Sequence, residues 1–157
     1  LPALALGVEK VEEGVMEQPP RRGDAPLFDR PFTLRLVWQG LMVGALTLTA
    51  YFLGMQAGED CANTMAFATL TLSQLFHAFN VRSGDESVFA MGITSNPAMN
   101  RAFLIGLALQ LAVLLLPPLQ GVFCVVSLNF RQWLGVLALA VAPIPICEMV
   151  KRIRNAE

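Results

Sequence analysis

Five polar side chains share one face of a long stretch without charged residues. Residues 61–81 contain no Lys, Arg, Asp or Glu, and within them lie Thr69, Ser73, Gln74, His77 and Asn80. At about 100° per residue these side chains fall within about 140° of one another on a helix. In a helix surrounded by lipid, such groups turn toward protein or toward a watery cavity.

This polar face has two interpretations, and both stay open at the level of sequence. In the first it lines a cation path, with Gln74 and His77 facing the ion and the Gln74 amide oxygen as a metal ligand, because hard cations prefer neutral or acidic oxygens. In the second, the hydroxyls and amides bond one helix to another. His77 suits a hydrogen-bonded helix interface better than a ligand role.

Other chemistry is missing from the sequence. There is no phosphate-binding glycine-rich loop and no nucleophile elbow, so the chain by itself has no catalytic residues that we can identify. Cys61, Cys124 and Cys147 lack the spacing of a metal site. We expect three unpaired cysteines, and a disulfide between Cys61 and Cys124 is the alternative.

The polar face belongs to one of four long neutral runs. Residues 36–58, 61–81, 102–130 and 132–147 carry no Lys, Arg, Asp or Glu, in a chain of 157 residues that is 55% hydrophobic and 15% charged. A membrane-spanning helix needs about 20 mostly apolar residues. The fourth run reaches that length if Glu148 and Met149 lie at the interface. A soluble bundle would need polar outer stripes, which residues 104–116 do not provide.

Capping residues and prolines place the ends of the predicted spans. The first covers residues 32–53, with Pro31 in its first turn, and the second covers residues 63–81, with Asn63 as N-cap. The third begins at Asn96-Pro97 and ends at Pro117-Pro118.

The fourth predicted span starts from Asn129, which forms a capping box with Gln132. Pro143 and Pro145 should kink or break it, leaving carbonyls that neighbouring helices must satisfy.

The basic residues predict how these spans are oriented. Ten lie before or in the first turn of the first span, between the second and third spans or in the first turns of the third, or after the fourth: Lys10, Arg21, Arg22, Arg30, Arg35, Arg82, Arg101, Lys151, Arg152 and Arg154. Only Arg131 falls on the other side. Because basic loops stay in the cytosol, we predict an all-α polytopic membrane protein with cytosolic N- and C-termini. Residues 1–31 would then be the end of a preceding helix and a cytosolic loop, and residues 32–157 a four-helix membrane region.

Two further motifs could bind partners. Gly40 and Gly44 form a GxxxG pair, which lets another helix approach closely, although the pattern is common enough to arise by chance. Glu9, Glu12, Glu13 and Glu17 form an acidic run that is either a solvated face or a docking surface.

Several segments together resemble the C-terminal end of P-type cation-transporting ATPases, especially calcium pumps. Residues 1–9 look like the end of that family's sixth membrane helix, and residues 15–21 (VMEQPPR) are similar to its Met-x-x-Pro-Pro-Arg loop. Gly40 and Gly44 match the GxxxG of the seventh helix. Residues 69–80 are similar to the eighth helix, and residues 132–134 match the start of the tenth.

The resemblance implies an enzyme that couples ATP hydrolysis to cation transport, most simply of calcium. ATP and Mg²⁺ would bind to domains preceding Leu1, and this chain would buttress the ion-binding helices of a multi-pass protein in the cell membrane. Its partners would be lipid and the rest of the same pump, not nucleic acid. Gln74 stands where reticulum calcium pumps have a glutamate ligand, and His77 where they have an asparagine. Glu12, Glu17 and Arg21 fall in the loop that would dock to the cytosolic domains.

Two alternatives remain. The same architecture could transport manganese, sodium or protons, because the helices that select the ion are not in this sequence. The chain could also be a four-span scaffold without enzymatic activity.

Overall fold

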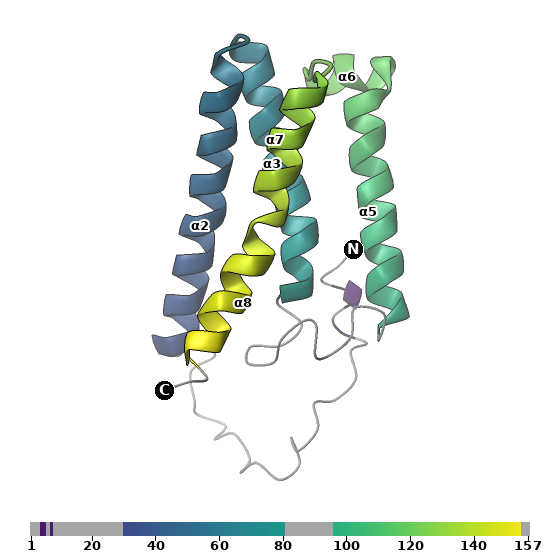
Figure 1. Ribbon diagram of the computed structural model, residues 1–157. Helices are drawn as coiled ribbons and strands as arrows, with labels where there is room; N and C mark the ends of the chain where they lie inside the picture. The colour runs from purple at the N-terminus through teal and green to yellow at the C-terminus, as the bar shows by residue number, and fades with distance from the viewer. Residues whose placement is uncertain (1–3, 6, 8–29, 81–95, 155–157) are drawn as a thin grey trace.

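The computed structural model describes residues 4, 5, 7, 30–80 and 96–154. Its numbered elements are all helices: α2 (Arg30–Met55), α3 (Glu59–Asn80), α5 (Pro97–Leu115), α6 (Pro117–Phe123), α7 (Phe130–Val141) and α8 (Pro143–Arg154). In Figure 1, α2, α3, α5 and the α7–α8 pair stand side by side, while short α6 lies across the upper end. The prediction of an all-α fold is therefore confirmed for the described residues.

Three of these helical segments are long and apolar enough to cross a membrane. They are Arg30–Met55, Pro97–Leu115 and Phe130–Ile153, and the last combines α7 with most of α8. The second predicted span, α3, has 22 residues but is not among the three. Its amides, hydroxyls and imidazole lower its hydropathy. It also packs against α2, α5, α7 and α8, so its neighbours shield much of its surface.

The local signals at the helix ends agree with the structure in most places. The Asn96 side chain accepts a hydrogen bond from the Met99 N–H at 3.0 Å, and Pro97 occupies the first turn of α5. Asn129 and Gln132 form the predicted reciprocal capping box, with bonds of 2.7 and 3.0 Å. These bonds satisfy N–H groups that have no partner inside the helix.

One predicted boundary was wrong. The second helix starts at Glu59 and not near Asn63, because Gly58 adopts a φ of 117° and reverses the chain just before it. Glu59 and Asp60 then lie in the first turn, where carboxylates stabilise the helix dipole. The segment between the predicted third and fourth spans contains the short helix α6. The prolines that end α5 also begin α6, since proline fits the first helical turn.

The last span is broken as its prolines predicted. Pro143 and Pro145 have no N–H, so the regular hydrogen bonding is interrupted and α7 gives way to α8 at Ala142. The interhelical bond at this break runs from Asn80 Nδ2 of α3 to the carbonyl oxygen of Pro143, at 3.2 Å. A side chain of the polar face thus holds the kinked span against α3.

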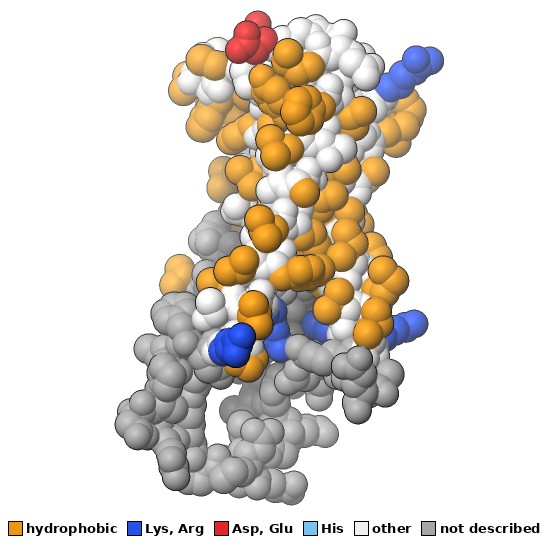
Figure 2. Space-filling model, turned by 90° about the vertical axis from the view of Figure 1, so that its left-hand side faces the viewer, with side chains coloured by type: hydrophobic (Ala, Val, Ile, Leu, Met, Phe, Trp, Pro, Cys, Tyr) orange, Lys and Arg blue, Asp and Glu red, His pale blue; other side chains and the backbone are white. Residues whose placement is uncertain are grey.

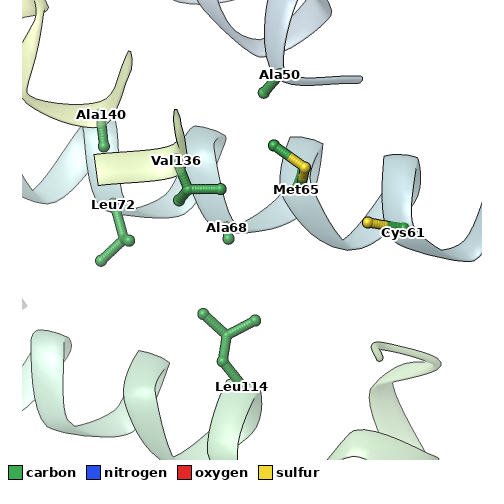
Figure 3. Packing of buried hydrophobic residues seen from close by; sticks show 8 residues of the cluster. All are labelled: Ala50, Cys61, Met65, Ala68, Leu72, Leu114, Val136 and Ala140. Carbon is green, nitrogen blue, oxygen red and sulfur yellow. The ribbon is translucent and has the colours of Figure 1, made fainter. Parts of the chain in front are cut away.

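The apolar core lies around α3 (Figure 3). Its members come from α2, α3, α5 and α7: Ala50, Cys61, Met65, Ala68, Leu72, Leu114, Val136 and Ala140. Small residues predominate where α2 meets α3. A Cβ atom added to Gly54 would lie 2.5 Å from the Cα atom of Ala62, so the two backbones touch at this point.

Charged side chains gather at the two ends of the bundle. Figure 2 shows mostly hydrophobic side chains over the middle of the face in view, with acidic groups at the upper end and most basic groups at the lower end. Glu59, Asp60 and Arg131 begin the helices that start at the upper end. Arg30, Arg35 and Arg101 lie at the lower end. The distribution matches the predicted one, and the assignment of the lower end to the cytosol stays a prediction.

Candidate functional site: a polar groove between three helices

A groove of about 940 Å³ runs between α2, α3 and α8. Most of its wall is apolar and comes from α2, including Phe32, Leu36 and Val43. Its polar wall gathers groups from all three helices: Arg35, Gln39, Gln74, His77, Asn80, Cys147 and Lys151. We call this feature the α2–α3–α8 groove. It brings together residues more than 100 positions apart in the sequence.

The polar face of α3 divides between the groove and the protein interior. Thr69, Ser73 and Asn80 are buried, Gln74 is exposed and His77 is half-buried. Their angular order on the helix explains the division. Thr69, Asn80 and Ser73 fall within about 40°, and Gln74 lies about 100° beyond Ser73, with His77 between them. Part of the face therefore bonds helices together, and the rest opens into the groove.

The two buried hydroxyls of the face, Ser73 and Thr69, differ in their hydrogen bonding. Ser73 Oγ donates to the Leu70 carbonyl at 2.9 Å, a bond within its own helix. Thr69 Oγ1 is buried and has no hydrogen-bond partner among the described residues. Unsatisfied buried hydroxyls are costly, so packing among the described residues does not explain Thr69.

Asn80 connects the groove to the end of α3. Only 2% of the residue is exposed, and its Nδ2 atom lies 3.3 Å from His77 Nδ1 as well as 3.2 Å from the Pro143 oxygen. The Asn80 carbonyl oxygen accepts from Lys151 Nζ at 3.4 Å. The Lys151 ammonium thus lies at the C-terminal end of α3, where a positive charge is favourable.

Glu148 and Lys151 form an ion pair that the sequence analysis missed. Their side-chain atoms Oε1 and Nζ lie 3.8 Å apart, and the residues are only 8% and 9% exposed. The i,i+3 spacing of opposite charges on one helix was the available signal. Glu148 was expected at the level of the membrane interface, and in the structure it is buried beside Lys151.

The Gln74 side chain is able to bind a further group. It is exposed on the groove wall, and no described residue forms a hydrogen bond with its amide. The amide can offer its oxygen to a cation or hydrogen-bond a neighbouring helix. The Gln74 side chain is thus available for the predicted role in the cation path, and that role stays a prediction.

The two glycines of the GxxxG motif also line this groove. A Cβ atom added at Gly40 or at Gly44 would meet nothing within 4 Å in the described part of the chain. The glycines therefore expose a bare strip of α2 backbone, which is the surface that a closely packed helix requires. Their predicted role in helix packing stays a prediction, since the helix would have to come from outside the described residues.

The proposed docking residues lie outside the described residues. These are Glu12, Glu17 and Arg21, together with the rest of the acidic run. Cys61, Cys124 and Cys147 are all free, so the disulfide considered for Cys61 and Cys124 is not formed. Within the described ranges, no three His, Cys, Asp or Glu residues lie close enough to hold a metal together.

The described residues form a helical bundle in which three segments are long and apolar enough to cross a membrane, which is the architecture of a helical membrane protein. Comparison with known sequences identifies the family. The family model described as "Cation transporting ATPase, C-terminus" matches residues 1–153, and the chain therefore belongs to this family. The resemblance to the C-terminal region of P-type cation-transporting ATPases is thereby confirmed.

Individual relatives are calcium-transporting enzymes by name. The chain is 36% identical over 171 residues to "Calcium-transporting ATPase 1" of Bacillus cereus, covering 96% of this chain and 19% of the relative. It is 34% identical over 146 residues to "Calcium-transporting ATPase" of Bacillus subtilis, covering 91% and 16%. A bovine relative, "Calcium-transporting ATPase type 2C member 1", is 29% identical over 157 residues, covering 99% and 16%. The chain thus spans less than a fifth of the length of these relatives.

Proposed function

We propose that this chain is the membrane support region of an ATP-driven calcium pump. The observation that carries the proposal is the α2–α3–α8 groove, which is lined both by the two bare glycines of α2 and by Gln74 of α3. The names of the relatives favour calcium as the transported ion. ATP and Mg²⁺ would bind in the larger part of the protein, which this chain does not include, and residues 1–31 would connect the two parts.

A helix from the preceding part of the same protein would fill the groove. In a bilayer, an unfilled groove would present Gln74 and His77 to lipid, which cannot hydrogen-bond to them. A helix packed against Gly40 and Gly44 would cover these groups and could form hydrogen bonds with them. The support region would in this way hold an ion-binding helix in place while its own helices stay packed on α3.

The proposal includes the arrangement of the chain in the membrane. At 22 residues α3 is about 33 Å long, enough to cross a hydrocarbon core of about 30 Å. Together with the three candidate spans, α3 would bring the number of spans to four, with its polar groups directed at protein. The end that carries Arg30, Arg101 and Lys151 would be cytosolic, which also puts both termini in the cytosol of a multi-pass cell-membrane protein.

Gln74 is proposed to contribute to the cation path. In the full-length pump, Gln74→Ala should weaken the apparent affinity for the transported cation about tenfold. The loss of one contact between an amide oxygen and the cation, worth about 1.4 kcal/mol, has that effect. The measurement is ATP-dependent calcium uptake into membrane vesicles at a series of calcium concentrations. Gln74→Glu should strengthen affinity, because a carboxylate binds calcium better than an amide.

Ser73→Ala provides the matched control for Gln74. Ser73 lies on the same turn, but it is buried and does not line the groove, so its loss should leave calcium affinity unchanged. Equal affinities in wild type and Gln74→Ala would remove Gln74 from the path. Titrating ATP hydrolysis with Ca²⁺, Mn²⁺, Na⁺ and H⁺ tests the choice of ion, and no cation-stimulated hydrolysis at all would favour the scaffold.

A further inference from the structure

The short helix α6 carries an apolar surface that the proposed function does not use. Val122 is 75% exposed, and Phe123 is exposed beside it. Both belong to residues 102–130, which carry no Lys, Arg, Asp or Glu. Exposed apolar groups gathered on one segment indicate a surface that contacts protein or lipid.

The length of α5 places α6 at the level of a membrane boundary. With 19 residues, α5 is about 28 Å long, slightly less than a hydrocarbon core of about 30 Å. Arg101 lies in its second turn, so the uncharged part of the helix is shorter still. Figure 1 shows α6 lying across the upper end of α5 and not extending away from it. In a bilayer, α6 would therefore stay within reach of the acyl chains.

The backbone at the turn into α6 finds its hydrogen bonds within the chain. Pro118 has no N–H, so the Leu114 carbonyl loses the donor it would have in a continuous helix. Gln120 Nε2 donates to that carbonyl oxygen at 2.7 Å. The N–H groups of Leu119 and Gln120 donate to the Leu116 oxygen, each at 3.0 Å. Because lipid offers no donor for a freed carbonyl, the bond from Gln120 suits a turn that lies in lipid.

Contacts with α3 hold the segment in place and leave one side of it open. The ring centroids of Phe123 and Phe67 lie 6.4 Å apart. Just beyond α6, the Val126 N–H donates to Thr64 Oγ1 of α3 at 2.9 Å. Val122 stays exposed, so the segment is fixed to the bundle while its apolar side is uncovered by the described residues.

The open side of α6 continues an apolar strip of α5. Ile105, Leu109 and Leu116 are exposed and fall within about 40° of one another at 100° per residue. In Figure 1, α5 stands at the edge of the bundle, with α3 as its long neighbour. Bulky aliphatic side chains on an outer helix suit acyl chains, whereas a closely packed helix favours small residues.

We propose that α6 is an interfacial anchor, with Val122 and Phe123 inserted among lipid acyl chains at the boundary of the bilayer. The anchor would fix the depth at which the chain turns from α5 to α7. The proposal rests on the membrane arrangement proposed above and does not depend on the transported ion. The turn between α2 and α3 provides a contrast at the same end, because Glu59 and Asp60 there are exposed and charged.

The test uses the full-length protein in lipid nanodiscs, which expose both membrane faces to reagents. A lipid-soluble aryl diazirine labels groups in the acyl region on illumination, and a sulfonated maleimide labels thiols in water. Mass spectrometry locates the products. We expect carbene insertion at Val122 and Phe123 and no reaction of the maleimide with Cys124, which is exposed at the end of α6. In the control variant Gln56→Cys, the thiol lies in the exposed α2–α3 turn and should react with the maleimide.

Two results would overturn the anchor. Maleimide labelling of Cys124 equal to that of Gln56→Cys would place α6 in water. Absence of both labels from α6, with carbene insertion at Leu109 of α5, would mean that another part of the protein covers it. If Leu109 were unlabelled as well, the membrane arrangement would fail together with the anchor. None of these results depends on calcium transport or on the α2–α3–α8 groove, which α6 does not line.

Discussion

Replacing Gly54 by alanine should destabilise the protein by about 1–3 kcal/mol, the usual cost of overpacking. An added Cβ atom would lie 2.5 and 2.9 Å from the Cα and N atoms of Ala62, and 3.0 Å from the Cys61 oxygen. All three atoms belong to the backbone of α3, so no side chain can rotate away. The α2 and α3 helices would have to separate, which a thermal-stability measurement in detergent would detect.

Two other glycines provide graded controls for this substitution. At Gly106 the nearest atom to an added Cβ is Leu75 Cδ2 at 2.7 Å, the far end of a flexible side chain, so Gly106→Ala should cost less. At Gly121 nothing lies within 4 Å, and Gly121→Ala should be nearly neutral. Equal stability of the Gly54 and Gly121 variants would show that α2 and α3 do not touch at this point.

Gly44→Leu should abolish ATP-driven transport in the full-length protein while leaving the fold of this region intact. No described atom lies within 4 Å of a Cβ added at Gly44, so α2 and α3 can keep their contacts. The leucine would instead fill the strip where we propose that a helix from the preceding part of the pump is seated. Vesicle transport and thermal stability, measured on the same preparation, would separate these two effects.

Ala45→Leu is the matched control on the same turn of α2. Ala45 is exposed but does not line the groove, so a leucine there should meet lipid and leave transport unchanged. Normal transport by Gly44→Leu would mean that the glycine strip has no closely packed neighbour. Equal loss in both variants would point to a general effect of bulk on α2.

Local chemistry made much of the fold predictable. Asn96 and Asn129 cap helices through bonds that span only three residues, and Pro143 breaks a helix by lacking its own N–H. Such effects depend on neighbours in the sequence. The error at Asn63 came from giving weight to a capping residue type and overlooking Gly58, whose positive φ sets the actual start of α3.

Contacts between distant segments could not be predicted in the same way. The Val126 N–H donates to Thr64 Oγ1 at 2.9 Å, and Asn80 bonds to Pro143 across 63 positions. Both bonds depend on how α3 is rotated relative to its neighbours. The sequence does not fix that rotation, because the polar face of α3 does not indicate which neighbouring helix it meets.

Only the part of the candidate site that depends on the helical period could be predicted. The helical period correctly put Gln74 and His77 on one side of α3, and both line the groove. It could not show that Thr69 and Ser73 are buried or that Cys147 comes close to His77, since those facts depend on how the helices pack against one another. The two glycines and Gln74 were separate motifs in the sequence, and only the packing of α2 against α3 shows that they border one groove.

A helix from the preceding part of the same protein is proposed to fill this groove, and photo-crosslinking can detect it there. A photoreactive amino acid would replace Val43, on the groove wall, or Leu104, which is 61% exposed on α5. Mass spectrometry of the illuminated full-length protein in membranes would identify the products. We expect links from position 43 to peptides that precede Leu1, and only lipid adducts from position 104. Lipid adducts alone from both positions would contradict it.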